Sequence, residues 1–495
     1  MVLWHRADHM LLDGGLRMGF VKSDAADRSA LNQRLLTAIA TATLWVPAAA
    51  FAAGQVPTPD LSVRQPVLLA PEFWIARLPH AQRVTLSTKA VVDRNTALLR
   101  LDPAMHDLRA VPDFLERHQV EAWLAISKRP SGTLFDANGR IVDSATLDNI
   151  VDNAAIVSIP ARQKTRFGLV VHRAALRTFP THMRVFSTTD DTDIDRFQES
   201  ALFPGTPVLI AHRSRDGAWL FIISPDYAAW VDAKAIAEGS REQVVSYVDH
   251  RPVRLVTGAT VRTSVTPDAP ALSELPLDMG VRLPLASLAD GSVVNGQEAG
   301  ASWAVEFPIR NTDGSLALQT ALITRSADTS SRPLPLTRAN MIRQAFKFLG
   351  ERYGWGDDGG TRDCSGFMSA VFSSMGVMLP RNTGDQSRSP VFNRHHFSGS
   401  NARQRHAAIA SLQAGDLVYM PGHVMLVVGR IGGEPYVIHD IHDGKTLDGG
   451  ALRSWHLNGV VVTPLTTLML DSSHRFVDVV TDVVNVLDPG KAGAQ

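Results

Sequence analysis

The alternation of hydrophobic and polar positions changes along the chain and divides it into regions. A run without charge, 35–51, follows Arg34 and ends in the small-residue pattern Ala50-Phe51-Ala52. A basic segment, an apolar run and a small-residue end are typical of a secretory signal peptide, which predicts that residues 1–53 are removed on export. A membrane anchor is the alternative interpretation, although the run is marginal in length for a span.

The pattern after residue 53 changes from helical to strand-like. Residues 54–164 mix short helices with turns, and Asn138-Gly139 between two apolar dipeptides predicts a hairpin. Residues 165–245 carry short apolar stretches separated by turns such as Asp216-Gly217, and the pattern repeats over 246–330. Short strands at this spacing are typical of small β-barrels. We therefore expect a helical N-terminal region followed by two small barrels.

Two helices are predicted after the Ser- and Pro-rich linker 326–336. Thr337 is placed to cap a helix over 338–349. A glycine-rich loop follows, and apolar residues at i+3, i+4, i+7 and i+8 from Cys364 predict a helix that begins at this cysteine and stops at Gly376. In the first turn of a helix, the dipole and the free N–H groups lower the pKa of a thiol and can stabilise an oxyanion. This position favours a reactive cysteine over a buried structural one.

Two histidines downstream are placed to act on this thiol. After a turn at Pro421-Gly422, His423 begins a predicted strand, and His439 lies in the next strand, 436–441. Neighbouring antiparallel strands can bring both side chains together on one face. A thiolate nucleophile needs a general base and a group that orients the base. The order Cys, His, His therefore predicts nucleophilic catalysis, although each histidine alone would more often be structural.

Composition and charge exclude several classes of function for this chain. The 495 residues suggest about three or four domains. Lys and Arg number 49, as do Asp and Glu, which excludes the general polyanion-binding surface of a nucleic-acid-binding protein. The single cysteine excludes an intrachain disulfide and any zinc or iron–sulfur site that needs several cysteines.

Two histidine-containing segments raise the alternative of metal binding. His395, His396 and His406 lie in the polar segment 388–411, for which a solvated loop or lid is the simpler interpretation. The segment 439–443 holds histidines and aspartates without further ligands at a fixed spacing. We therefore expect neither a metal ion nor another cofactor.

Residues from 337 to about 466 resemble the NlpC/P60 family of papain-like cysteine peptidases, which implies an α+β catalytic domain. The matching motifs are Tyr353-Gly354-Trp355-Gly356, Asp363-Cys364-Ser365-Gly366-Phe367, Leu379-Pro380-Arg381-Asn382-Thr383, Gly415-Asp416-Leu417-Val418, His423-Val424 and Val437-Ile438-His439.

The order of the regions resembles a subgroup of that family with an N-terminal stabilising domain and two bacterial SH3-like barrels. The resemblance implies a multidomain protein that consists, in chain order, of a signal peptide at 1–53, a stabilising domain at 54–164, SH3-like barrels at 165–245 and 246–330, a peptidase domain at 337–470 and a C-terminal tail at 471–495.

The resemblance also implies the catalytic roles. Cys364 would be the nucleophile, His423 the general base and His439 the residue that orients His423. Members of the family hydrolyse stem peptides of the bacterial cell wall, typically between γ-D-glutamate and a diamino acid.

Substrate-binding roles follow from the same resemblance. In relatives with two barrels, the residues that flank the nucleophile bind the free amine of an N-terminal L-alanine, and the adjoining barrel adds an acid and a tyrosine. The implied substrate-binding residues in this sequence are Asp363, Ser365, Tyr353, Trp355, Glu199 and Tyr227.

We therefore predict a periplasmic or secreted cysteine endopeptidase, monomeric, that acts on peptidoglycan stem peptides or muropeptides and does not bind nucleic acid. Contact with a membrane is expected only if the signal segment stays uncleaved. Two alternatives stay open. One is a peptidoglycan-binding scaffold with a vestigial catalytic domain. The other is a Cys–His amidase or acyltransferase with another substrate.

Overall fold

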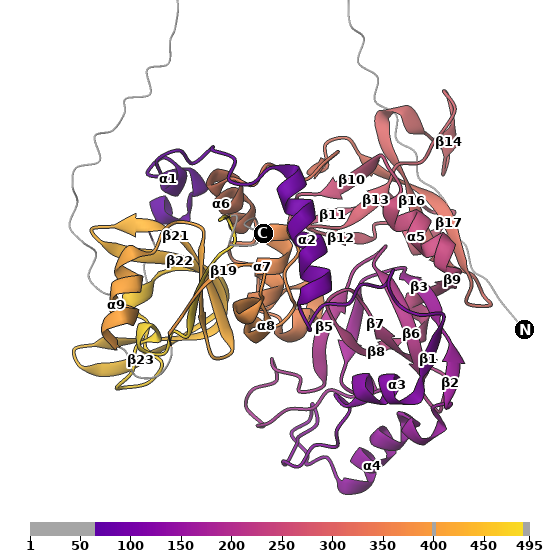
Figure 1. Ribbon diagram of the computed structural model, residues 1–495, viewed down its shortest axis with the longest axis horizontal. Helices are drawn as coiled ribbons and strands as arrows, with labels where there is room; N and C mark the ends of the chain where they lie inside the picture. Colours follow the sequence, from indigo (N-terminus) through magenta and orange to yellow (C-terminus); the bar gives the residue numbers. More distant parts are fainter. Residues whose placement is uncertain (1–64, 398–401, 489–495) are drawn as a thin grey trace, which may run out of the picture. The chain divides into compact units, whose positions relative to one another are not determined.

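The computed structural model describes residues 65–397 and 402–488 (Figure 1). The predicted signal peptide at 1–53 lies outside the described residues, so its export function stays a prediction. Among the residues that are described, no helix is long and apolar enough to cross a membrane.

The helices that precede the first sheet belong to two different hydrophobic cores. They are α1 (Pro71–Ile75), α2 (Thr88–Leu101), α3 (Arg117–Leu124) and α4 (Ser144–Asn153). Trp74 of α1 and Leu98 of α2 pack in the core that surrounds the helix beginning at Cys364. Val120 of α3 instead packs against the seven-stranded sheet of residues 166–239, called the first sheet below. The predicted hairpin is present, because Phe135 bridges Ile141 in antiparallel fashion. A separate N-terminal domain stays a prediction.

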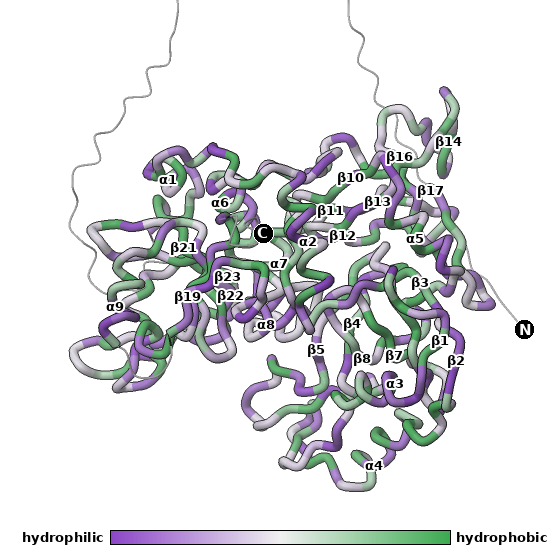
Figure 2. Tube along the Cα trace, in the orientation of Figure 1, coloured by the Kyte–Doolittle hydropathy of each residue, from purple (hydrophilic) through white to green (hydrophobic). Residues whose placement is uncertain are grey.

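Residues 166–239 form a seven-stranded antiparallel sheet with the order β5-β4-β8-β7-β6-β3-β9. Its strands are β3 (Arg166–Val170), β4 (Ala174–Arg177), β5 (Gln198–Leu202), β6 (Pro207–Arg213), β7 (Trp219–Ile223), β8 (Ala228–Asp232) and β9 (Ile236–Gly239). The predicted turn at Asp216-Gly217 joins β6 and β7, and Gly217 has a φ of 72°. Every residue of β7 is buried, and this apolar strand is drawn mostly green in Figure 2.

Helix α5 (Arg241–Asp249) leads to a second β region. Its strands are β10 (Val253–Val256), β11 (Thr260–Arg262), β12 (Pro276–Asp278), β13 (Arg282–Pro284), β14 (Val293–Val294), β15 (Gln297–Glu298), β16 (Ser302–Arg310), β17 (Leu316–Thr324) and β18 (Thr329–Ser330). They form several small sheets, and Leu277, Phe307 and Ile323 share one core. Its assignment as a second SH3-like barrel stays a prediction.

The last region combines helices with a six-stranded sheet of order β19-β24-β20-β21-β22-β23. The strands are β19 (Asn393–His396), β20 (Asp416–Met420), β21 (His423–Ile431), β22 (Glu434–Asp448), β23 (Ala451–Pro464) and β24 (Asp482–Asn485). The helices are α6 (Arg338–Phe346), α7 (Cys364–Ser373), α8 (Thr383–Arg388) and α9 (Ala402–Ser411). Alternate residues of β21 enter two cores: Val424 and Leu426 face α6 and α7, and Met425 and Val427 face the opposite side.

Three segments of this region differ from the expectations. Helix α6 is capped by Thr337 as expected, but it ends at Phe346, three residues earlier than the periodicity suggests. The segment 388–411 is not only a loop, because it contributes β19 and α9. Residues 471–488 are not a tail: β24 pairs with both β19 and β20, and Val484 lies in the core.

Candidate functional site

Cys364 lies at the first position of α7, as the periodicity predicts. Asp363 caps this helix, because its Oδ1 accepts a 2.8 Å hydrogen bond from the N–H of Gly366. The thiol is 5% exposed, and its Sγ is 3.8 Å from the carbonyl oxygen of Gly422, the residue before His423. The cysteine helix therefore meets the sheet at the start of β21.

The ionisation of the thiol differs from the expectation. Burial, followed by the negative charge of Asp363, raises the pKa of Cys364, and a hydrogen bond from the Val424 N–H lowers it only in part. The helix dipole was expected to lower this pKa, but the dry surroundings oppose the charged form. The free protein therefore holds a neutral thiol, whose proton has to leave when the sulfur attacks a carbonyl carbon.

The two histidines lie together, as the order of strands predicts. The Nε2 atom of His423, the first residue of β21, is 2.9 Å from the Nδ1 atom of His439 on β22. The Nε2 atom of His439 is in turn 2.8 Å from the hydroxyl oxygen of Thr463 on β23. Burial lowers the pKa of His423 to about 4, so its ring is neutral at pH 7 and can accept a proton.

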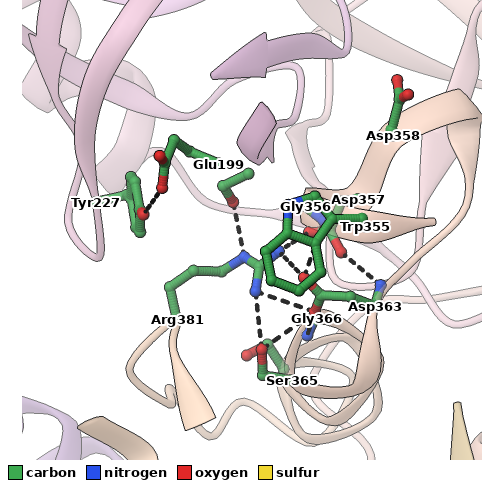
Figure 3. Close-up of polar contacts among 12 residues, drawn as sticks. Glu199, Tyr227, Trp355, Gly356, Asp357, Asp358, Asp363, Ser365, Gly366 and Arg381 are labelled. Atoms are coloured by element: carbon green, nitrogen blue, oxygen red, sulfur yellow. Dashed lines mark hydrogen bonds and ion pairs between the residues drawn. The ribbon is translucent and has the colours of Figure 1, made fainter. Parts of the chain in front are cut away.

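Arg381 lies at the centre of a buried polar cluster beside the cysteine helix (Figure 3). Its Nη2 is 2.8 Å from Asp363 Oδ2 and 3.2 Å from Asp357 Oδ2. Its Nη1 donates to the Ser365 hydroxyl at 2.9 Å, and its Nε donates to Ser200 on β5 at 2.7 Å. The guanidinium thereby links the capping residue of α7 to the first sheet.

The cluster holds one carboxylate firmly charged and shifts the other toward neutrality. Burial raises the pKa of Asp357 to about 6, although Arg381 opposes this shift. Burial also disfavours charge on Asp363, but Arg381 and the N–H of Gly366 outweigh it and lower the pKa of Asp363 below its usual range. Gly366 is required here, because a Cβ would lie 2.0 Å from Asp357 Oδ1.

Glu199 and Tyr227, the two candidates from the first sheet, contact each other. The Tyr227 hydroxyl donates a 2.5 Å hydrogen bond to Glu199 Oε2, and the Thr178 hydroxyl donates to Oε1. Figure 3 shows this pair beside Arg381, and the charges of Arg381 and Asp363 both act on Tyr227. The structure therefore places the two candidates beside Arg381, which binds Asp363 and Ser365.

Tyr353 and Trp355 lie in or next to the glycine-rich loop and differ in their surroundings. The Trp355 indole N–H donates to the carbonyl oxygen of Gln198 at 3.1 Å, which fixes the loop to β5. Burial raises the pKa of Tyr353, so its hydroxyl keeps its proton, and a negative charge formed on Cys364 would raise this pKa further.

The segments considered for metal binding form ion pairs. His442 Nε2 is 3.4 Å from Asp193 Oδ2, and Asp191 is close enough for the three side chains to meet around one ion. Asp193 is already compensated, because Arg352 lies 2.7 Å away and Asn458 donates to it at 2.8 Å. In the segment 388–411, His396 pairs with Asp482 at 2.9 Å, and His406 lies 3.8 Å from Asp478.

Asp440, next to His439 on β22, is a buried acid that no sequence pattern marks as a site residue. Its side chain is fully buried, and neither carboxyl oxygen has a hydrogen-bond partner in the described structure. Burial and the charges of Asp363, Glu351 and Asp357 raise the pKa of Asp440 to about 9. The folded protein therefore keeps a proton on Asp440 at neutral pH.

This proton makes stability depend on pH. An unfolded Asp loses its proton near its ordinary pKa of 3.8, whereas Asp440 in the folded chain keeps it up to about pH 9. Unfolding releases a proton in this window, so the free energy of unfolding falls as pH rises, by at most about 1.4 kcal/mol per pH unit. We expect Asp440→Asn to flatten this fall between pH 5 and 8, measured by chemical denaturation.

A matched variant separates this effect from a general change of the sheet. Asp448 ends the same strand, and its side chain is 75% exposed. Asp448→Asn should leave the pH dependence as it is in the wild type. Parallel curves for Asp440→Asn and the wild type would contradict the prediction.

Two parts of the chain match known families. Residues 350–456 match the NlpC/P60 family, and residues 184–232 match an SH3 domain of the SH3b1 type. The first match contains Cys364, His423 and His439, and the second contains Glu199 and Tyr227.

Curated relatives share shorter segments with the chain. A γ-D-glutamyl-L-lysine dipeptidyl-peptidase of Bacillus cereus is 30% identical over 171 residues, which cover 33% of this chain and 44% of the relative. A probable endopeptidase p60 of Listeria seeligeri is 39% identical over 96 residues, 18% of this chain and 16% of that protein. The chain thus spans less than half of the length of these relatives.

A solved structure extends the likeness in fold. An NlpC/P60 endopeptidase from Photobacterium damselae subsp. piscicida matches with a TM-score of 0.67 over 84% of this chain and 97% of that one. The sequence identity is 16%, so this likeness concerns the fold alone.

Proposed function

We propose that this chain, a peptidase of the NlpC/P60 family that also carries an SH3 domain, is an exported cysteine endopeptidase of cell-wall stem peptides. The bond would be the one between γ-D-glutamate and a diamino acid, in peptides with a free N-terminal L-alanine. One observation carries the proposal. Cys364, at the start of its helix, lies next to the start of the strand that begins at His423, and the His423 side chain contacts His439.

The proposed chemistry follows from the neutral state of both groups. Burial raises the pKa of the Cys364 thiol and lowers the pKa of His423, so both groups are neutral before the reaction. His423 therefore takes the proton of the thiol while the sulfur attacks the carbonyl carbon. The imidazolium then protonates the leaving amine of the diamino acid. Water hydrolyses the thioester between Cys364 and the peptide, and the thiol is restored.

The proposed specificity rests on the charges beside the cysteine. Asp363 and Glu199 are carboxylates, Asp357 is a third acid, and Arg381 is the guanidinium that pairs with Asp357 and Asp363. Arg173, whose charge also acts on Asp357, is itself paired with Asp278. Negative charge is therefore in excess, which favours an ammonium ligand in a buried site. The amine of an N-terminal L-alanine has this chemistry, and the closed cluster leaves a substituted amine without a charged partner.

The test uses defined muropeptides and mass spectrometry of the products. L-alanyl-γ-D-glutamyl-diaminopimelate should yield the dipeptide L-alanyl-D-glutamate and the diamino acid, whereas the N-acetylated peptide should be cleaved far more slowly. Equal cleavage of both peptides would contradict the amine specificity. Binding to sacculi without release of any peptide would favour the scaffold alternative.

A variant in the first sheet tests the role of the barrel. We expect Glu199→Gln to lower kcat/KM for the free-amine peptide by about 10- to 100-fold, because one charge-assisted hydrogen bond is lost. The effect on the N-acetylated peptide should be much smaller. Glu238→Gln is the matched control, since Glu238 lies on β9 of the same sheet and pairs with Arg166 at a half-exposed position.

A further inference from the structure

Thr463 makes a contact that the proposed catalytic roles do not include. In the β22–β23 pairing, Thr463 lies opposite Val437 and Val461 lies opposite His439. Thr463 is therefore a diagonal neighbour of His439 on the same face of the sheet. Both side chains are fully buried, and the 2.8 Å contact between Thr463 Oγ1 and His439 Nε2 is isolated from solvent.

Thr463, His439 and His423 form one line of hydrogen-bond contacts, which runs from β23 to the start of β21, beside Cys364. A neutral imidazole has one nitrogen that donates and one that accepts. Because the Nε2 of His423 contacts His439, its Nδ1 is the nitrogen left for the thiol proton. That Nδ1 can accept a proton only if the ring already carries its own proton on Nε2.

This requirement passes along the line. If His423 Nε2 carries a proton, it donates to the Nδ1 of His439, which then has to be bare. His439 must carry its own proton on Nε2, and the atom within reach of that N–H is the Thr463 hydroxyl oxygen. The opposite arrangement would place a proton on His423 Nδ1, where it would block transfer from Cys364.

We propose that Thr463 is a positioning residue that sets the tautomer of His439, and through it that of His423, by accepting a hydrogen bond from His439 Nε2–H. This inference rests on the proposed function for its kinetic consequence, but the tautomer itself exists in the free protein. Thr463 touches neither the substrate nor the reacting sulfur in this role.

Removal of the hydroxyl gives a specific defect. In Thr463→Val the Nε2–H of His439 would be buried without a partner, which is unfavourable, so the proton moves to Nδ1. His423 then receives a hydrogen bond at Nε2 and keeps its proton on Nδ1. We expect kcat to fall by about 10- to 100-fold with KM unchanged, and Thr463→Ser to restore kcat to within about threefold of the wild type.

The control is a second buried threonine of the same pair of strands. Thr446 on β22 is 2% exposed, and its hydroxyl accepts a 2.9 Å hydrogen bond from the Trp455 indole. Thr446→Val should change kcat less than twofold. A loss in Thr463→Val that Thr463→Ser does not restore would indicate a packing role and overturn the proposal, as would a Thr463→Val enzyme with the kcat of the wild type.

A substrate-free readout separates this inference from the proposed function. Nitrogen-15 NMR of the imidazoles reports the protonated nitrogen, and the signals of His439 are identified by their absence in His439→Asn. The wild type should show His439 protonated on Nε2, and Thr463→Val should show it on Nδ1. An inactive wild type with this shift would refute the peptidase function alone, whereas an unchanged tautomer in Thr463→Val would refute the role of Thr463.

Discussion

Replacement of Cys364 by alanine is expected to lower the rate of hydrolysis of L-alanyl-γ-D-glutamyl-diaminopimelate by at least about 10³-fold. The sulfur is the proposed nucleophile, and no second cysteine exists in the 495 residues to replace it. Chromatography with mass spectrometry of the released dipeptide measures the loss. Hydrolysis by the purified variant at the wild-type rate would remove the proposed role of Cys364.

The lone cysteine also provides an internal standard for this experiment. In denaturant, iodoacetamide should add one label to the wild type and none to Cys364→Ala, so the fraction of unoxidised thiol in the sample can be compared with the activity. Ser373→Ala serves as the matched control, because Ser373 ends the same helix and its hydroxyl bonds only to the carbonyl oxygen of Ala370 in the described structure. Its activity should equal that of the wild type.

The second large effect is expected for stability. Arg381→Met leaves Asp357 and Asp363 buried without their shared cation, and the loss of one partner of a buried ion pair costs about 3–5 kcal/mol. Thermal unfolding, followed by circular dichroism, should show a clearly lower midpoint. Arg388→Met is the control, because Arg388 pairs with Asp385 and its side chain is 63% exposed.

A second substitution shows whether the uncompensated charge is the cause. Asp357→Asn in the Arg381→Met background removes one of the two stranded carboxyl groups and should recover part of the lost stability. If Arg381→Met and Arg388→Met had the same midpoint, the cluster would not stabilise the fold. If the double variant were less stable than Arg381→Met, the charge argument would be wrong.

The sequence predicted the elements whose signals are local. Apolar spacing placed the start of α7 at Cys364, and the Pro421-Gly422 turn placed His423 at the start of a strand. The contact between His423 and His439 followed from these strands being consecutive and antiparallel. Such signals depend on neighbouring residues, so one sequence is enough to detect them.

The features of the site that the sequence did not predict depend on contacts between segments that are distant along the chain. Arg381 belongs to the motif Leu379-Pro380-Arg381-Asn382-Thr383, but its partners Asp357 and Ser200 come together only in the folded chain. Thr463 gave no signal, because the sequence pattern predicts no strand over 451–464, where β23 lies. The pKa of Cys364 was expected to fall, since helix position can be read from a sequence and desolvation cannot.

The docking of the glycine-rich loop on β5 has a consequence for the history of the chain. A Cβ on Gly356 would lie 2.9 Å from Gln198 and 3.0 Å from the backbone of Glu199, and the Gln198 amide donates to the Gly356 carbonyl oxygen at 2.9 Å. Neither surface can change alone without a clash or a lost bond. Replacement of this barrel by one from an unrelated gene would disrupt the contact between the two surfaces. We therefore expect the barrel and the peptidase domain to be inherited as one unit.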